Sequence, residues 1–290
     1  MPNKQQISRI NDALYFIHND ITADLSAANL SRQASYTEQH FHRLFKQVVG
    51  EPVHHYVRRI RLENAANQLM FSSKTSIIDI AIKCGFLSLS SFSKAFKQYF
   101  SVTPGQWRKS DQPLSKRSYL SNSEIAKAYQ HNRHHPLPRV KLKRLPPRLV
   151  AYIRHQGYDR SIKNAWQQLT GWALAEGIEG YQEFGLHHSN PTWVALNECR
   201  YVACIGIDKP LTKRSRVNSM TIPGGLHAVV ELEGKYGDLL PWISRIIEEW
   251  LPQSGFKLQT TPTYVQYHRN HFIEVDECFK VSLCIPVALL

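Results

Sequence analysis

The sequence predicts a multidomain protein with an all-α N-terminal domain that carries two helix-turn-helix motifs. The C-terminal domain is predicted to be α+β and to contain duplicated strand-helix-strand-strand modules. Three observations predict this class: the excess of positive charge is confined to the first half, short helix pairs recur there about 50 residues apart, and a different repeat occupies residues 140–290. A chain of 290 residues is long enough for two domains that each bury a core.

The uneven distribution of charge separates the two halves. Residues 1–144 contain 22 Lys and Arg against 9 Asp and Glu, a net charge of +13, whereas residues 145–290 contain 14 of each. A module that binds nucleic acid phosphates typically carries such an excess of cationic side chains. A basic surface that only maintains solubility is the alternative that charge alone leaves open.

Apolar residues at helical spacing predict the first three helices of the basic half. One helix spans 7–19, and Asp24 can cap a short second helix. Thr37 can cap a third helix that runs to about Val48, and Gly50 ends it. The second helix, a turn and the third helix form the first helix-turn-helix motif.

A second motif of the same layout follows a longer helix over 52–70. Ser76 and Asp79 form a capping box for a helix that ends before Gly85, which supplies the turn. Ser88 can cap the last helix, whose inward stripe is aromatic. The chain therefore presents two similar helix pairs.

The second helix of such a pair enters the DNA major groove, so its outward side chains are the candidate DNA-binding residues. Phe41 and Phe92 mark the inward faces. The outward side chains are Gln39, His42, Arg43 and Lys46 in the first helix and Leu89, Ser90, Ser93, Lys94 and Lys97 in the second. Arg43 could bind a guanine with two hydrogen bonds, and Gln39 could pair with an adenine. Phosphate contacts are expected for Arg58, Arg59, Arg61 and Lys97. A solvated helix face is the alternative for each.

Residues 111–139 differ in composition and predict a linker, with a short helix around 124–129. They are rich in Ser, Gln, Asn, His and Pro and poor in large aliphatic residues. His131, His134 and His135 could suggest a metal, but no rigid element presents them together, so we predict neither a metal nor a cofactor. The predicted boundaries are 1–110 for the DNA-binding domain, 111–139 for the linker and 140–290 for the second domain.

Residues 140–290 contain an internal repeat. The first copy is LVAYIRHQGYDRSIKNAWQQLTGWA, and the second is HAVVELEGKYGDLLPWISRIIEEWL. Each copy has an apolar strand, then Gly, Tyr and Asp, then an amphipathic helix with two Trp residues. Alternating strands follow at 199–207, 263–268 and 279–287. Two such copies imply a sheet with pseudo-twofold symmetry and a cleft between its halves.

The order of motifs in residues 76–108 resembles the second half of the AraC/XylS-type DNA-binding domain. The pattern is I-x-x-I-A-x-x-x-G-F, then S-x-F-x-[RK]-x-F-K, then Pro and an aromatic-Arg pair. The matching residues are Ile77, Ile80, Ala81, Gly85, Phe86, Ser90, Phe92, Lys94, Phe96, Lys97, Pro104, Trp107 and Arg108. The resemblance covers about residues 7–108 and implies two helix-turn-helix units that read successive major-groove faces of an asymmetric site. The departures, where the family usually has Ala, Gly and Gly, are Ser31, Ser35 and Ser101.

Residues 140–290 resemble a gyrase-inhibitor-like (GyrI-like) effector-binding domain. The matching pieces are the duplicated layout, ECRYVACIGI, IPGGLHAV, GKYGDL and WLPQSGF. The resemblance implies a cleft for small, often apolar and cationic molecules, which clustered aromatic side chains bind by stacking and cation–π attraction. The candidate ligand-binding residues are Trp166, Trp193, Glu231, Trp242 and Tyr264.

One departure concerns the charge of that cleft. The family commonly places an acidic residue in a P-x-[FY]-E-x-Y strand, and this chain has Val265 at that position. Glu231 or Glu198 could replace the missing carboxylate, the ligand could be neutral, or the pocket could be vestigial. Ligand binding and a structural role both stay open.

Together these features predict a transcription regulator, an activator, that binds double-stranded DNA sequence-specifically and senses a small lipophilic or aromatic ligand. RNA polymerase is a further expected partner. The alternatives for the C-terminal domain are a protein-interaction module and a module that hydrolyses small molecules. We predict no enzyme and no catalytic residue, because no Ser-His-Asp spacing, metal motif or phosphate loop is evident. The absence of an apolar N-terminal segment and of long apolar runs predicts a cytoplasmic, nucleoid-associated bacterial protein outside the membrane.

Overall fold

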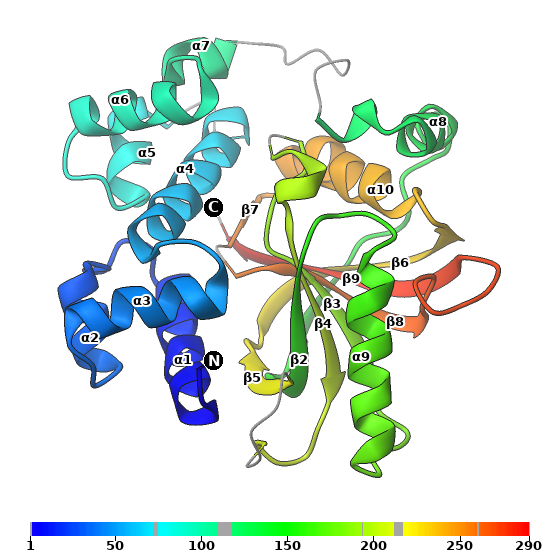
Figure 1. The fold of residues 1–290 in the computed structure, drawn as a ribbon. Coiled ribbons are helices and arrows are strands. Elements are labelled where there is room, and N and C mark those ends of the chain that lie inside the picture. The colour runs from blue at the N-terminus through cyan, green and yellow to red at the C-terminus, as the bar shows by residue number, and fades with distance from the viewer. Residues whose placement is uncertain are drawn as a thin grey trace. The chain divides into compact units, whose positions relative to one another are not determined.

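The computed structural model describes residues 2–71, 75–109, 118–192, 194–211, 217–259 and 261–289. The chain divides into two compact units, the first unit (residues 1–113) and the second unit (residues 114–290). The first unit is helical and the second combines helices with an antiparallel sheet, which confirms the predicted fold class (Figure 1).

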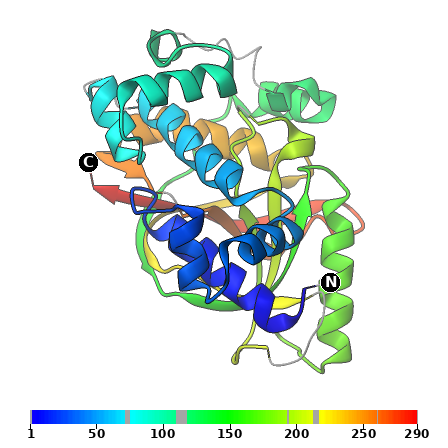
Figure 2. The same ribbon diagram turned by 60° about the vertical axis from the view of Figure 1, so that its left-hand side comes forward.

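Helices α1 to α7 form the first unit, and α4 lies between its two helix-turn-helix motifs (Figures 1 and 2). The bounds are α1 (Lys4–Asn19), α2 (Ala27–Gln33), α3 (Glu38–Val49), α4 (Val53–Phe71), α5 (Ile77–Lys83), α6 (Leu89–Phe100) and α7 (Pro104–Lys109). Helices α2 and α3 make the first motif, and α5 and α6 make the second. Rings from both recognition helices fill the core, since Phe41, Phe45, Phe92 and Phe96 are all 0% exposed.

Side-chain caps begin these helices mostly where the sequence predicts them. Thr37, Ser76 and Ser88 each accept a hydrogen bond, 3.1 to 3.4 Å long, from the backbone N–H three residues further on. Each cap satisfies one donor that the first helical turn leaves unpaired. The cap of α2 differs from the prediction: Ser26 supplies it, because the Asp24 carboxylate instead accepts from the Ser26 N–H at 3.0 Å.

Left-handed backbone occurs at the turn within each motif and at the end of each recognition helix. Gly85 at φ 80° and Gly50 at φ 90° adopt it without a Cβ clash. The equivalent positions are Ser35 at φ 56° and Ser101 at φ 64°. Both motifs therefore keep the same turn geometry, at a cost of about 1–2 kcal/mol for each serine.

The second unit is built around a sheet with the strand order β1-β6-β9-β8-β3-β4-β2-β5, in which β7 pairs with β9. All of these pairings are antiparallel. The strands are β1 (Lys141–Leu145), β2 (Arg148–Gln156), β3 (Glu183–His187), β4 (Arg200–Gly206), β5 (Asn218–Ile222), β6 (Gly225–Lys235), β7 (Phe256–Leu258), β8 (Thr263–Arg269) and β9 (Cys278–Leu289). The helices are α8 (Ser123–Asn132), α9 (Ile162–Ala175) and α10 (Leu239–Arg245), and short helical turns occupy Ser118–Ser121, Leu196–Glu198, Ile246–Trp250 and Leu251–Gln253.

Two strand-helix-strand-strand modules confirm the predicted duplication. They are β2–α9–β3–β4 and β6–α10–β8–β9, and they meet where β3 pairs with β8. The modules also exchange strands: β1 leads into β2 but pairs with β6, and β5 leads into β6 but pairs with β2. The two connections touch, because a Cβ atom on Gly224 would lie 2.6 Å from the backbone nitrogen of Pro147. Only glycine fits this crossing.

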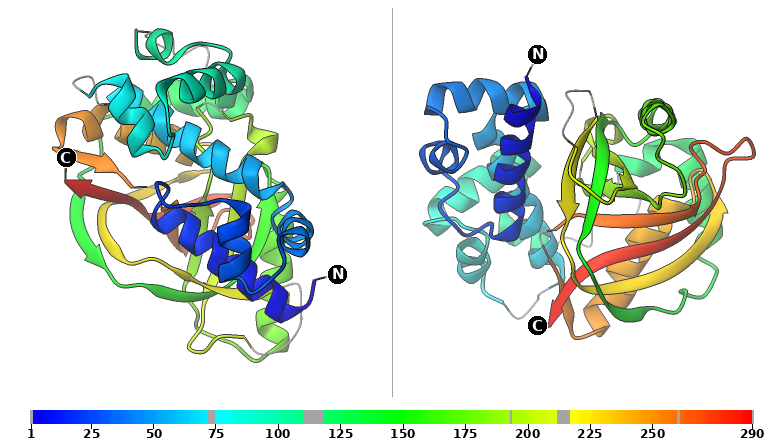
Figure 3. Two further views of the ribbon diagram at one scale, coloured as in Figure 1. Left: turned by 90° about the vertical axis from the view of Figure 1, so that its left-hand side faces the viewer. Right: turned by 90° about the horizontal axis from the view of Figure 1, so that it is seen from below.

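One face of the sheet carries the larger core, to which α8, α9 and α10 contribute (Figure 3). Tyr119, Ile125 and Tyr129 are at most 5% exposed and belong to that core. The stretch 111–139, predicted as a linker with a short helix, thus contains a helical turn at Ser118–Ser121 and the helix α8, which three spaced apolar side chains anchor to the core. The exact domain boundaries stay a prediction.

Replacing Ser101 by Gly should raise the free energy of unfolding of the first unit by about 1 kcal/mol, because glycine adopts the left-handed conformation without Cβ strain. Urea denaturation followed by circular dichroism measures the change. Ser93→Gly is the matched control: it lies inside α6, where the same substitution should lower stability by about 0.5–1 kcal/mol. A loss of stability in Ser101→Gly would contradict the strain at this turn.

Candidate DNA-binding and ligand-binding sites

The predicted DNA-binding side chains all lie on the accessible faces of α3 and α6. The exposed ones are Gln39, Arg43, Lys46, Leu89, Ser90, Lys94 and Lys97, and the partly exposed ones are His42 and Ser93. Arg43 Nη2 lies 3.0 Å from His40 Nδ1. The α3 face carries long hydrogen-bonding side chains, whereas the α6 face offers short hydroxyls beside lysines. The assignment of these residues to DNA contacts stays a prediction.

Two of the three arginines on α4 contact protein groups instead of facing outward. Arg59 Nη2 lies 2.7 Å from Glu51 Oε1, and its Nη1 lies 3.2 Å from Glu63 Oε1. Arg61 donates to two backbone carbonyls that precede α2, at 2.8 and 3.0 Å. The expected phosphate contacts therefore do not hold for Arg59 and Arg61. Arg58 is exposed and donates to a glutamine of α6 at 2.6 Å.

The Arg59 contacts join the two motifs. Glu51 follows the end of α3, Glu63 lies on α4, and the Tyr99 hydroxyl of α6 donates to Glu63 Oε1 at 3.3 Å. Glu63 is 7% exposed. Removing Arg59 would leave a buried carboxylate without its cation, which typically costs about 3–5 kcal/mol. Arg59, Glu51, Glu63 and Tyr99 form the α4 network, which holds α3 and α6 in one arrangement.

In the second unit, three aromatic side chains meet at the centre of the helix-covered face. Trp166 Nε1 donates to the Tyr201 hydroxyl at 3.2 Å, and the Tyr201 and Tyr267 hydroxyl oxygens lie 3.2 Å apart. Gly185 makes room for this group, because a Cβ atom there would collide with the Tyr201 hydroxyl. Val265, paired with Gly185 across β3 and β8, is 0% exposed. The centre of this face is therefore apolar and aromatic, without a carboxylate at position 265.

A small cavity of about 40 Å³, the α8 cavity, lies beside this aromatic group. Ile125 of α8 and Leu239 and Leu240 of α10 contribute apolar walls. His187, the last residue of β3, and His271, which follows β8, also line it. A cavity of this size holds about one water molecule.

The ring nitrogens of these two histidines are buried without hydrogen-bond partners among the described residues. This holds for both nitrogens of His187 and for Nδ1 of His271. The His187 side chain is partly accessible at the strand end, but its ring lies between Tyr158 and Tyr201. Burial lowers the pKa of His187 to about 4, and burial together with the neighbouring His187 lowers the pKa of His271 to about 3. Both imidazoles are therefore neutral near pH 7.

Two arginines hold α8 over the cavity. Arg160 donates to Glu124 of α8 at 3.0 Å through Nη2 and to Glu277 at 2.7 Å through Nε. At the other end of α8, Arg245 Nη1 donates to the backbone carbonyl of Asn132 and to that of a residue just beyond the helix, the second at 3.0 Å. These contacts satisfy carbonyls that the end of a helix leaves unpaired.

The structure does not bring the predicted ligand-binding residues together. Trp166 lies in the aromatic group, and Trp242 packs beneath the Arg245 guanidinium at 5.2 Å. Tyr264 and Glu231 share the opposite face of the sheet, where Tyr264 belongs to the smaller core and the Ser282 hydroxyl donates to Glu231 Oε2 at 2.8 Å. Trp193 lies outside the described residues. Glu198 is exposed. Their assignment to a ligand stays a prediction, and Glu231 cannot act as the counter-ion beside Val265.

Sequence reasoning missed His187 and His271. They are 84 residues apart in the chain and meet only through the pairing of β3 with β8. The sequence contained one signal for His187. Side chains alternate between the two faces of a strand, so His187, two residues after Gly185, lies on the same face of β3 as that glycine.

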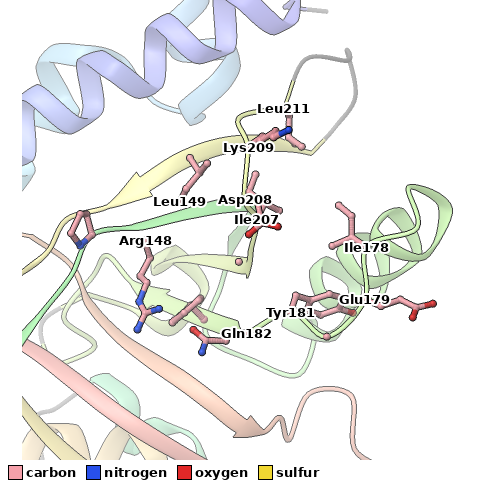
Figure 4. A pocket seen from close by; sticks show the side chains of 14 residues that line it. Arg148, Leu149, Ile178, Glu179, Tyr181, Gln182, Ile207, Asp208, Lys209 and Leu211 are labelled. Atoms are coloured by element: carbon pink, nitrogen blue, oxygen red, sulfur yellow. The ribbon is translucent and has the colours of Figure 1, made fainter.

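A second, open cavity of about 660 Å³ lies where β2 and β3 begin and β4 ends (Figure 4). Leu149 and Ile207 contribute apolar surface, and Arg148, Asp208 and Lys209 contribute mixed charges. No cluster of three potential metal ligands occurs among the described residues. In the same ranges, no helix has the length and apolar character that a bilayer span requires.

Two protein-family models match the chain, and their order confirms the predicted one. Residues 30–110 match a helix-turn-helix domain, and residues 138–288 match the GyrI-like small molecule binding domain. The chain belongs to the AraC-type helix-turn-helix transcription regulators that carry a GyrI-like domain.

Individual relatives match mainly over the length of one domain. The HTH-type transcriptional activator AarP of Providencia stuartii is 38% identical over 106 residues, which cover 37% of this chain and 78% of AarP. The transcriptional regulator Rob of Salmonella typhimurium is 35% identical over 107 residues, which cover 37% of each chain. A cryo-EM structure of an EcmrR–DNA complex matches 91% of this chain and 99% of its own, with 14% identity and a TM-score of 0.45.

The two buried histidines should make the second unit sensitive to acid. Their pKa values are lower in the folded chain than the unfolded value of about 6.5, so the unfolded chain binds more protons below that pH. The free energy of unfolding should fall by up to about 1.4 kcal/mol per pH unit for each histidine as the pH decreases from about 6.5 to 5.

Thermal unfolding followed by tryptophan fluorescence reports this change, because five of the six Trp residues follow residue 114. His187→Phe should reduce the slope of the free energy of unfolding against pH by the contribution of one histidine. His268→Phe is the control, since His268 is exposed and contacts Ser282. An unchanged slope in His187→Phe would show that this imidazole is not held neutral.

Proposed function

We propose that this regulator reads an asymmetric duplex with α3 and α6 and that its second unit binds a small effector. The observation that carries the DNA part is the pair of accessible faces on two recognition helices joined by α4. Two helices on one chain suit half-sites about one helical turn apart. The nine outward side chains are the proposed contacts, with Arg43 as the main base reader and Lys97 at a phosphate.

Activation of transcription, contact with RNA polymerase and a cytoplasmic, nucleoid-associated location belong to the same proposal. The similarity to AarP, which is named a transcriptional activator, supports activation. The excess of positive charge in residues 1–144 supports residence on DNA, because cationic side chains bind any duplex through its phosphates.

A hydrolase is the second candidate function of the GyrI-like domain, and one grouping of side chains bears on it. The Ser161 hydroxyl lies 3.0 Å from His155 Nε2 and also contacts the Asp159 carboxylate. In a catalytic triad the carboxylate orients the histidine, whereas Asp159 here accepts from the Ser161 hydroxyl and its backbone N–H. The grouping lies just before α9, where Ser161 makes no side-chain cap hydrogen bond, and it lacks the order that activates a nucleophile, so effector binding is the better supported function.

Arg43→Ala should weaken binding at one base pair and leave the others unchanged. The expected loss of discrimination is about 1–3 kcal/mol, because a bidentate contact to a base edge is removed. Lys97→Ala should instead weaken all sequences equally and reduce the slope of log affinity against log salt by about 1. Gel-shift titrations on a duplex enriched from a random library, with each base pair varied, distinguish the two results. A uniform loss in Arg43→Ala would reassign that side chain to a phosphate.

A broad thermal-shift screen of lipophilic cations and neutral aromatic compounds should find at least one that stabilises the full chain. Binding to the folded state alone raises stability by about 2.7 kcal/mol at a ligand concentration 100 times the dissociation constant. The same compound should change the affinity for the enriched duplex. If no compound in the library shifts the melting temperature, the second unit is a structural or protein-interaction module.

A further inference from the structure

A pair of neutral imidazoles that line a small cavity is unexplained by packing alone. A neutral imidazole has one N–H donor and one acceptor nitrogen. A buried group of this kind costs about 1–3 kcal/mol when it has no partner. Phenylalanine would fill the same space between the aromatic rings without that cost. His187 and His271 therefore point to a partner that the described chain does not supply.

The charges around the cavity restrict what that partner is. Val265 and Gly185 leave no carboxylate at the centre of the sheet. Asp159 lines the cavity but is exposed and accepts from the Ser161 N–H at 2.7 Å, and Glu277 is paired with Arg160. A cation would compete with the Ser161 hydroxyl and N–H for Asp159, and an anion would meet imidazoles that are uncharged at neutral pH. Either ion would lose its hydration without compensation.

We infer that the α8 cavity binds an uncharged aromatic or lipophilic molecule through one hydroxyl- or amide-type group that bridges His187 and His271. The inference rests on the proposed small-molecule function of the second unit and names the ligand class. The bridging group accepts from the N–H of one imidazole and donates to the free nitrogen of the other. Tyr158, Phe272 and the leucines of α10, which line the cavity, supply the apolar contact.

Such a molecule requires more space than the cavity of about 40 Å³ has. Ile125 projects from α8 into this region and is 2% exposed. The ligand takes the place of the Ile125 side chain, and α8 moves away from the sheet. The contacts that resist this movement are those of Arg160 and Arg245 at the two ends of the helix. Because α8 follows the first unit in the chain, its position is the feature of the second unit that a ligand changes first.

Four probes of similar size and different charge test the ligand class on the full-length chain. They are 2-phenylethanol, ethylbenzene, 2-phenylethylammonium and phenylacetate, each titrated by calorimetry near neutral pH. The Ile125→Ala variant enlarges the cavity under α8. Ile178→Ala is the matched control, because Ile178 lines the other, open cavity. Circular dichroism and binding to the enriched duplex verify that each variant is folded.

The expected result is that 2-phenylethanol binds Ile125→Ala about tenfold more tightly than each other probe. Ile178→Ala should show no such gain. Adding His187→Phe to Ile125→Ala should remove the tenfold advantage of the alcohol over ethylbenzene, and His271→Phe should do the same. In the Ile125→Ala protein, binding of the alcohol should also move the imidazole ¹⁵N resonances of both histidines.

Equal affinity for ethylbenzene, tighter binding of a charged probe, or no binding to Ile125→Ala would overturn the inference. Retention of the alcohol's advantage in both histidine variants would also overturn it and would leave an ordered water as the partner. A compound from the broad screen that binds the wild type and the histidine variants equally would place the effector site elsewhere, and the proposed function would stand. Failure of every compound in that screen would instead reject the effector function itself.

Discussion

The architecture of the second unit depends on the crossing of two short connections at Gly224 and Pro147. Each module gives one edge strand to the other, so the two halves cannot separate without breaking the pairings of β1 with β6 and of β5 with β2. The close approach leaves no room for a side chain at position 224. Because the outer strands are held in this way, β3 and β8 lie side by side at the centre of the sheet. The pairing register of β3 and β8 then determines which residues lie opposite each other there.

That register determines what occupies the middle of the sheet. Gly185 and Val265 face each other there, and the space above the glycine is taken by the Tyr201 hydroxyl. A sheet with this symmetry could present an open cleft between its halves, but here the hydrogen-bonded aromatic group and α8 reduce the space to a small cavity. The same packing buries both ring nitrogens of His187 and Nδ1 of His271.

Local signals predicted the first unit well, because helix caps, turns and apolar stripes depend on residues close in sequence. Ser76, Thr37 and Ser88 act as expected. Arg59 and Arg61 were misjudged because their partners include residues that no helical pattern identifies. Because only a few side chains of α8 are apolar, the sequence predicted only a short helix around 124–129 within a linker, whereas α8 is longer and packs on the core. The recognition faces were placed on the surface correctly, but their contacts depend on a duplex.

The candidate ligand site was harder to predict from the sequence than the first unit. The repeat indicated two modules and a central strand pair, yet the register between distant strands is not encoded locally. Tyr264 and Val265 are neighbours and therefore point to opposite faces of β8, which separates one predicted ligand residue from the cavity. The two histidines carry no motif, and their importance follows only from burial in the assembled fold.

The α4 network has a consequence for promoter architecture. Because Arg59 pairs with Glu51 beyond α3 and with Glu63, which also accepts from Tyr99 of α6, we expect α3 and α6 to act as one rigid reader in the proposed function. Each base pair inserted between two half-sites turns one of them by about a tenth of a revolution around the duplex. A rigid reader cannot follow that rotation, so the length of the spacer is as much a part of the recognised sequence as the bases. Promoters with matching half-sites but an altered spacer would lie outside the regulon of this protein.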